Sequence, residues 1–121
     1  MTSNTEIVKK MMKAWENKDG DIVRSLLHDD YQGSCPMMGT IDADQCVEFI
    51  KDCPYGGKSI NHEIIAEGDK VAQSFDWVIT SPFQATVPMV EIMEFKNGKV
   101  KTSKMYFDTA LFPAEDTEQV S

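Results

Sequence analysis

Two strand-forming segments on either side of an Asn-Gly pair constrain this chain more than any other feature. Residues 90–96 and 100–107 are rich in β-branched and aromatic side chains, and Asn97-Gly98 lies between them. An Asn-Gly pair in this setting is the strongest short-range signal of a β-hairpin. The sequence therefore predicts two antiparallel strands joined by a tight turn.

The first of these strands carries one acid on an otherwise apolar face. Alternation along a strand puts Glu91 on the same face as Met89, Met93 and Phe95. Glu94 falls on the opposite face, where an acid is ordinarily in contact with water. A carboxylic acid among apolar neighbours is typical of a ligand pocket whose acid has a perturbed pKa.

Length, composition and charge exclude several classes of protein. The chain has 121 residues, of which 41% are hydrophobic and 26% charged, and this fits one domain with one core. Its net charge of −8 argues against binding to nucleic acid and to anionic membranes. The sequence has no signal peptide at its start and no apolar segment of membrane-spanning length, so we expect a cytoplasmic protein.

The cysteines give no sign of a metal or a disulfide. Cys35, Cys46 and Cys53 are odd in number, and none has a partner at zinc-binding spacing. We expect free thiols, with Cys46 and Cys53 packed in or near the core. No metal and no cofactor is predicted.

Helical patterns fill the first half of the chain. Ser3 or Asn4 can cap a first helix, which ends near residues 17–20. A second helix, with its buried face at Ile22, Val23, Leu26 and Leu27, should stop at His28-Asp29-Asp30. After a short strand at residues 31–35, Asp42 should cap a third helix.

The second half has the period-two pattern of strands. These are expected at residues 59–67, 70–80, 86–96 and 100–112. Helices followed by an antiparallel meander predict an α+β domain, with the helices packed on one face of a curved sheet. We assign residues 1–112 to this single domain and 113–121 to a polar, frayed tail.

Several short motifs occur in an order that resembles the nuclear transport factor 2-like superfamily, and within it the SnoaL-like proteins, which include ketosteroid isomerase-like and polyketide cyclase-like members. The motifs are Ala14–Asp19, Leu26–Tyr31, Gly68–Val71, Gly98–Val100 and Tyr106–Asp108. The resemblance implies a cone, made of a bent mixed or antiparallel sheet and three helices, that encloses a pocket. It also implies a homodimer. Fold resemblance alone does not define a reaction, because the family includes enzymes and non-catalytic binders.

Comparison with the enzymes of this superfamily is informative at four positions. Glu91 matches the place of the proton-donating acid of ketosteroid isomerase-like members. Cys35 stands where their general base is expected, and Met12 where their assisting tyrosine is expected. Met105 stands where limonene epoxide hydrolase-like members have an Asp, so neither enzyme's full set of residues is present.

The resemblance and the residue pattern together give candidate catalytic residues. Glu91 is the candidate acid, and the candidate base is Asp76, His62 or a water near Cys35. Asp76 lies outside the pocket if Phe75 and Trp77 line it, although a one-residue bulge would reverse the faces.

The remaining candidates are ligand-binding residues. They are Trp15, Tyr31, Cys35, Met37, Phe75, Trp77, Met93, Met105 and Phe107. These side chains predict a small, apolar ligand. We expect a small-molecule-binding protein with one of two functions. It is either a cofactor-free isomerase, cyclase or dehydratase that transfers protons on an apolar carbonyl compound, or a non-catalytic ligand-binding or dimeric interaction module.

Overall fold

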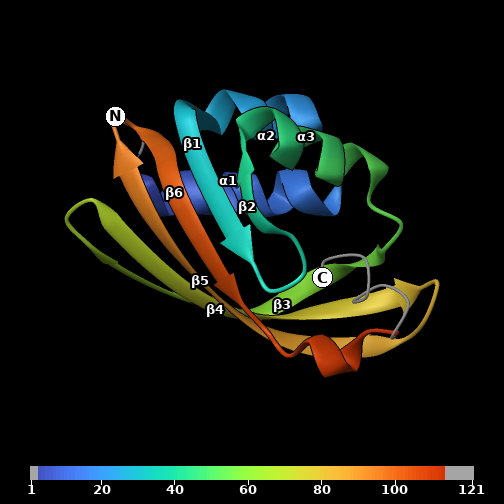
Figure 1. The fold of residues 1–121 in the computed structure, drawn as a ribbon. Coiled ribbons are helices and arrows are strands. Elements are labelled where there is room, and N and C mark those ends of the chain that lie inside the picture. The colour runs from blue at the N-terminus through green and yellow to red at the C-terminus, as the bar shows by residue number, and fades with distance from the viewer. Residues whose placement is uncertain (1–2, 114–121) are drawn as a thin grey trace.

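The computed structural model describes residues 3–113, which form three α-helices and one six-stranded sheet. The elements are α1 (Asn4–Glu16), α2 (Gly20–Leu26), β1 (Leu27–Cys35), β2 (Gly39–Asp42), α3 (Ala43–Asp52), β3 (Gly56–Glu67), β4 (Lys70–Ser81), β5 (Ala85–Lys96), β6 (Lys99–Tyr106) and a 3₁₀ helix, η1 (Thr109–Leu111). The helices cover one face of the curved sheet (Figure 1). The predicted α+β fold is confirmed. Of the tail predicted at 113–121, residues 114–121 lie outside the described residues.

The sheet is mixed and does not close. Its strand order is β2-β1-β6-β5-β4-β3, so β2 and β3 form the two edges. Only the β1–β6 pair is parallel among these six strands; the other neighbours are antiparallel. The parallel pair places the first strand beside the last one, in the middle of the sheet.

The hairpin predicted at Asn97-Gly98 is confirmed. Both residues have positive φ angles, 55° and 76°, which is the conformation of a two-residue type I′ turn. The strands leave the turn in register, with Lys96 opposite Lys99. The pairing then shifts by one residue between Phe95 and Glu94. Alternation along β5 buries Glu91 on the inner face and leaves Ile92 exposed on the outer one.

The strand predicted at residues 100–112 is too long. β6 ends at Tyr106, and the side chain of Asp108 accepts a hydrogen bond from the amide of Ala110 at 2.9 Å. That bond caps η1. A local side-chain acceptor thus turns the chain away from the sheet.

The first strand begins earlier than predicted. The second helix stops before His28–Asp30 as expected, but it ends at Leu26, and Leu27 and these three residues already belong to β1. Leu27 pairs with Val100 of β6, a partner that is remote in the sequence and therefore invisible to local patterns. β2 was not predicted, and it is only four residues long.

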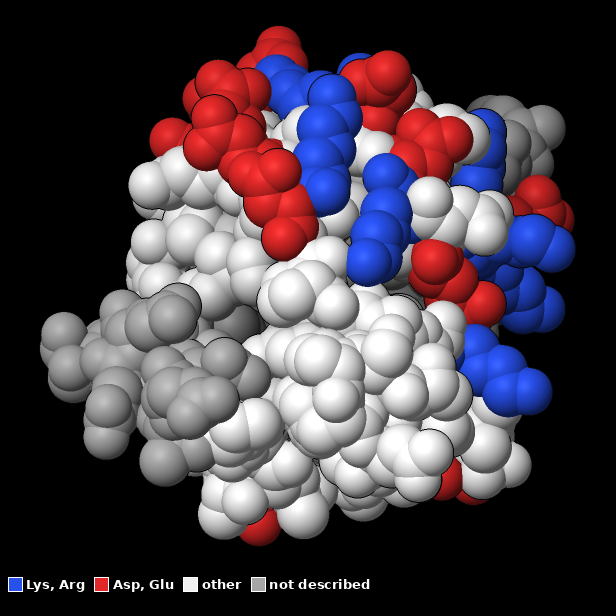
Figure 2. Space-filling view, turned by 90° about the vertical axis from the view of Figure 1, so that its right-hand side faces the viewer, with Lys and Arg blue, Asp and Glu red and all other residues white. Residues whose placement is uncertain are grey.

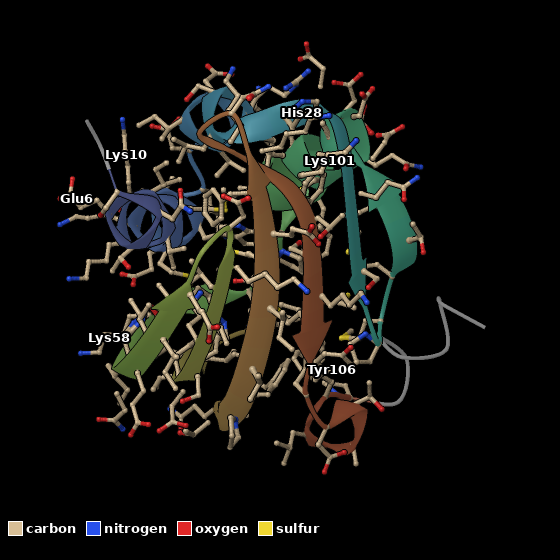
Figure 3. All side chains as sticks on the ribbon, turned by 90° about the vertical axis from the view of Figure 1, so that its left-hand side faces the viewer. Glu6, Lys10, His28, Lys58, Lys101 and Tyr106 are labelled. Carbon is tan, nitrogen blue, oxygen red and sulfur yellow. The ribbon has the colours of Figure 1, made fainter. Side chains whose placement is uncertain are left out.

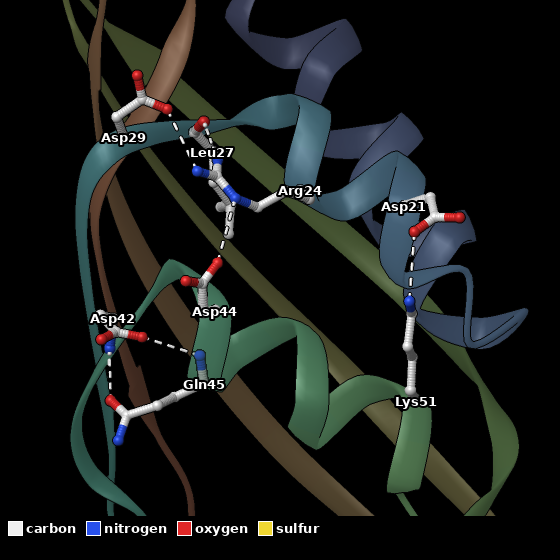
Figure 4. A network of polar contacts seen from close by, with 8 residues as sticks. All are labelled: Asp21, Arg24, Leu27, Asp29, Asp42, Asp44, Gln45 and Lys51. Carbon is white, nitrogen blue, oxygen red and sulfur yellow. Dashed lines mark hydrogen bonds and ion pairs between the residues drawn. The ribbon is translucent and has the colours of Figure 1, made fainter.

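The helix caps agree with the sequence. The Ser3 side chain accepts a hydrogen bond from the Glu6 amide at the start of α1. Asp42 and Gln45 exchange side-chain and backbone hydrogen bonds in a full capping box at α3 (Figure 4). Such a cap typically contributes about 1 kcal/mol.

Ion pairs at the surface connect the helices to each other. Arg24 of α2 contacts Asp29 and Asp44, and Lys51 of α3 contacts Asp21 (Figure 4). Exposed pairs of this kind contribute about 0–1 kcal/mol each. On the side of the molecule shown in Figure 2, charged side chains gather over the helices, whereas the surface below them is almost uncharged.

The main core lies between the helices and the inner face of the sheet. Ile7, Val8 and Met11 of α1 lie at helical spacing and are buried there. Ile22 was expected to be buried with them but is 37% exposed.

Candidate functional site

A cavity of about 130 Å³ lies between the helices and the inner face of the sheet. This volume is about ten times what one ordered water needs. Its walls come from α1, α3, the segment from β1 to β2, and β4, β5 and β6. Most lining side chains are apolar, so the few polar ones determine what chemistry the cavity can support.

Glu91 is the central polar group of the cavity. It lines the cavity from β5 and is only 7% exposed. Burial raises the pKa of its carboxyl group, although a hydrogen bond from Gln73 opposes that rise. Gln73 Nε2 donates this bond to Oε1 at 2.9 Å, and the second oxygen has no partner within residues 3–113. A proton on that second oxygen could be donated to a ligand.

A second polar pair joins β1 to β6 across the cavity wall. The Tyr31 hydroxyl and Ser103 Oγ are 2.5 Å apart, and both side chains are buried. Burial, the largest cause, raises the pKa of the Tyr31 phenol well above its ordinary value. Gly33 makes this contact possible, because a Cβ there would lie 2.1 Å from the Tyr31 hydroxyl.

Sulfur atoms line much of the remaining wall. Cys35, Cys46 and Cys53 all line the cavity. So do Met12, Met37, Met38, Met89 and Met105. Burial raises the pKa of the Cys46 thiol to about 12 and also raises that of Cys35, so both thiols are protonated at neutral pH. The wall is therefore soft and polarisable, and the raised pKa of the Cys35 and Cys46 thiols makes these two weak nucleophiles at neutral pH.

Aromatic rings form another wall of the cavity. The ring of Phe112 lies 5.5 Å from Tyr55, 5.5 Å from Phe107 and 6.0 Å from Phe83, measured between centroids. These separations are in the range of favourable aromatic pairs. Phe112 thus connects the end of the described chain to the cavity.

A polar chain of three side chains reaches the cavity from α1 and β3. Ser59 Oγ donates a hydrogen bond to Glu16 Oε1 at 2.7 Å and lies 2.9 Å from His62 Nε2. Glu16 lines the cavity, whereas His62 is exposed and stacks on Phe75.

The structure brings together most of the residues predicted to bind a ligand. Those that line the cavity are Trp15, Tyr31, Cys35, Met37, Phe75, Trp77, Met105 and Phe107. Met93 does not line it. Its side chain is 1% exposed and packs in the main core.

Neither of the two side chains predicted as a candidate base, Asp76 and His62, lines the cavity. The pairing of β4 with β5 runs without a bulge, so Phe75 and Trp77 keep the inner face and Asp76 the outer one. Asp76 accepts a hydrogen bond from Asn61 Nδ2 at 2.9 Å there. His62 is on the inner side of β3 but beyond the cavity wall.

Sequence reasoning missed three polar residues of the site. Gln73 shares the strand parity of Phe75, which is a sufficient signal that it points inward. Glu16 follows Met12 by four residues, so helical spacing puts it beside the apolar stripe. Ser103 precedes Met105 by two residues and so shares its face, but its pairing with Tyr31 depends on the unpredicted β1–β6 contact.

A family model described as SnoaL-like domain matches residues 8–102. The chain belongs to the SnoaL-like domain family. The resemblance noted from the sequence motifs is therefore confirmed, and the matched range spans every element from α1 to the middle of β6. No match was found among curated proteins.

Solved structures share the fold of this SnoaL-like domain. An NTF2-like protein of unknown function from Cytophaga hutchinsonii has a TM-score of 0.78 at 15% identity, covering 91% of this chain and 94% of that one. An LEH-like epoxide hydrolase from M. tuberculosis has a TM-score of 0.76 at 19% identity, covering 94% and 88%. TerC, co-crystallised with polyporic acid, has a TM-score of 0.78 at 22% identity, covering 88% and 92%. The fold is thus one that small-molecule isomerase-like and hydrolase-like proteins share.

Two further properties of the SnoaL-like domain concern metals and membranes. No three or more His, Cys, Asp or Glu side chains between residues 3 and 113 are grouped so that they could hold a metal ion. Over the same range, no helix combines the length and the apolar character needed to cross a membrane.

Proposed function

We propose that this SnoaL-like domain binds a small, largely apolar carbonyl compound and acts on it by proton transfer without a cofactor. The observation that carries the proposal is Glu91, a buried acid with a raised pKa that lines an apolar cavity. A neutral carboxylic acid can donate a hydrogen bond to a ligand oxygen, whereas a carboxylate cannot. A preorganised donor stabilises the negative charge that develops on that oxygen when a neighbouring carbon loses a proton.

The Tyr31–Ser103 pair supports the same function. The two hydroxyl groups have two protons between them, and their mutual hydrogen bond uses one. The other can be donated to a ligand, since both residues line the cavity. Isomerisation, cyclisation and dehydration of a carbonyl compound each pass through an enol or enolate that such donors would stabilise.

The cavity wall favours a ring-containing ligand. Thioether and thiol sulfur atoms make favourable contacts with aromatic rings, and Phe75 and Trp77 offer faces for stacking. The co-crystal of TerC with polyporic acid supports a small organic ligand for this fold.

Calorimetric titration with 2-naphthol tests the role of Glu91, because this compound has the skeleton and the hydroxyl oxygen of a cyclic enol. We expect 2-naphthol to bind more tightly than naphthalene. Glu91→Gln should keep most of this preference, since the amide also donates. Glu91→Leu should lose it, by about tenfold in affinity for one hydrogen bond.

Glu94→Leu is the matched control, because Glu94 lies on the same strand, three residues after Glu91, on the opposite, exposed face. It should leave both affinities unchanged. Equal binding of 2-naphthol and naphthalene to the wild type would contradict the proposed role of Glu91.

A non-catalytic binding protein is the second candidate function, and one observation favours it. Cys35 occupies the position where ketosteroid isomerase-like members are expected to have a base, and burial keeps its thiol protonated. If no other base faces the ligand, the cavity would bind a carbonyl compound without changing it. The cytoplasmic location and the homodimer stay predictions under either function.

A further inference from the structure

Two carboxyl groups line the cavity within the described part of the chain, and they come from opposite walls. Glu91 lies on the sheet, and Glu16 lies at the end of α1. Their surroundings differ, because Glu91 is held by a buried amide and Glu16 by a half-buried serine. Two acids in different environments are a frequent arrangement for separate acid and base roles.

Glu16 is held by two hydrogen bonds to the same oxygen. The hydroxyl of Ser59 donates to Oε1 at 2.7 Å, and its backbone amide donates at 3.4 Å. Oε2 has no hydrogen-bond partner among residues 3–113. The side chain is therefore fixed in direction while one oxygen stays available to accept a proton.

A bulge in β3 brings His62 into this arrangement. Asn61 has a φ of 57°, and the pairing of β3 with β4 shifts between Ile60 and Glu63. The extra residue moves His62 to the same face as Ser59, three positions earlier. His62 then stacks on Phe75 at 5.5 Å with an interplanar angle of 14°.

The donor and the acceptor are fixed in both hydrogen bonds that link His62, Ser59 and Glu16. Ser59 has a single hydroxyl proton, and it donates that proton to Glu16. His62 Nε2 must therefore donate to Ser59 Oγ across their 2.9 Å contact. The bulge thus supplies a donor that orients the Ser59 hydroxyl toward the carboxyl group.

We propose that Glu16 is the base of the proton transfer, with Ser59 as its positioning residue; the inference rests on the proposed function. Oε2 takes a proton from the carbon next to the ligand carbonyl. The electron pair of the broken C–H bond forms the C=C bond of an enolate, whose oxygen accepts a hydrogen bond from Glu91. Return of a proton from Glu16 to the same or another carbon regenerates a ketone.

Exchange of the carbon-bound protons of 2-tetralone for deuterium tests this step without knowledge of the natural substrate. The ketone is incubated with the protein in D₂O and followed by proton NMR. Glu16→Gln should slow the protein-dependent exchange by about 10²-fold or more, the scale for losing a general base. Its calorimetric affinity for 2-tetralone should be unchanged, because the carbonyl contact to Glu91 is retained.

Glu48→Gln is the matched control, because Glu48 is an exposed carboxylate on α3 that does not line the cavity. Its exchange rate should equal that of the wild type. Glu16→Asp keeps the carboxylate on a shorter side chain and should give an intermediate exchange rate. This second variant tests the role of Glu16 even if Glu16→Gln does not fold.

Ser59 is tested by a pair of substitutions. Ser59→Ala should lower the exchange rate without changing the affinity for 2-tetralone, and Ser59→Thr should restore the rate because it restores the hydroxyl. A purely structural role of Ser59 would instead change rate and affinity together.

The outcomes separate this inference from the proposed function. Binding of 2-tetralone with exchange that Glu16→Gln leaves unchanged would overturn the role of Glu16 alone. Binding without any catalysed exchange would also overturn it, and would favour the non-catalytic binder. Failure of 2-tetralone and 2-naphthol to bind would overturn the proposed function, and the base assignment with it.

Discussion

Gln73 donates a hydrogen bond from Nε2 to Oε1 of Glu91 at 2.9 Å, and both side chains are buried on adjacent strands. The carbonyl oxygen of Gln73 has no hydrogen-bond partner in the described structure. The amide therefore supports the acid with one bond only, which is too little to offset its burial. This relationship explains why the pKa of Glu91 is raised.

The raised pKa of Glu91 should appear in the pH dependence of stability. The folded state holds this proton more tightly than the unfolded chain, where the pKa is about 4.3. The stabilisation is complete below that pH and is lost as pH rises through the folded-state pKa, by up to about 1.4 kcal/mol per pH unit. Urea denaturation at a series of pH values should show this fall in the wild type and not in Glu91→Gln.

Glu94→Gln provides the comparison for that experiment, because Glu94 is exposed on the outer face of β5. Its stability curve should run parallel to that of the wild type. If the difference between wild type and Glu91→Gln does not change with pH, Glu91 is not buried in its neutral form.

Gly33→Ala should destabilise the protein by about 1–3 kcal/mol, the usual range for overpacking. The new Cβ would lie 2.1 Å from the Tyr31 hydroxyl and 2.7 Å from the ring carbon that bears it, so the phenol would have to leave Ser103. Gly20→Ala is the control, since its Cβ would meet mainly the flexible chain of Lys51. Equal loss of stability in the two variants, measured by urea denaturation, would argue against the Tyr31 contact.

The three thiols should differ in reactivity. Cys46 is buried, with a pKa raised to about 12, whereas Cys35 and Cys53 are half-buried. We expect N-ethylmaleimide to modify Cys46 last in the folded protein, as followed by mass spectrometry. Bound 2-naphthol should slow the modification of Cys35, since both occupy the cavity. Unchanged rates with saturating 2-naphthol would place the ligand elsewhere.

The outer face of the sheet should pair two copies of the chain. Val90 and Ile92 are each 42% exposed there, and Tyr106 is 53% exposed at the end of β6 (Figure 3). Val90→Glu should weaken the dimer, because it places a charge in an apolar contact. Ile22→Glu, on α2, should leave it unchanged. Sedimentation of the wild type at micromolar concentration as a 13.6 kDa species would contradict the dimer.

The parts of the fold that depend on local pattern were predictable. Turn residues defined the hairpin at Asn97, side-chain oxygens defined the caps at Ser3 and Asp42, and alternation defined the inner face of β5. Errors occurred where a distant partner decides the outcome. Leu27 has the apolar character of a helix face, and only pairing with Val100 makes it a strand residue.

The site was less predictable than the fold. Alternation correctly put Glu91, Phe75 and Trp77 around the cavity, but it cannot tell cavity wall from filled core, and Met93 belongs to the core. The bulge at Asn61 also reverses the parity of β3, so His62 shares a face with Ser59 and not with Ile60.

The parallel pairing of β1 with β6 has a consequence for biosynthesis. The Tyr31–Ser103 hydrogen bond joins residues 72 positions apart, so one half of the site leaves the ribosome long before the other. Until residues 99–106 follow, β1 has β2 as a neighbour but lacks β6 on its other edge, and the cavity lacks the wall that β6 forms. A nascent chain that ends before β6 should therefore expose apolar surface and bind no ligand, and release of the last strand would be the event that completes both sheet and site.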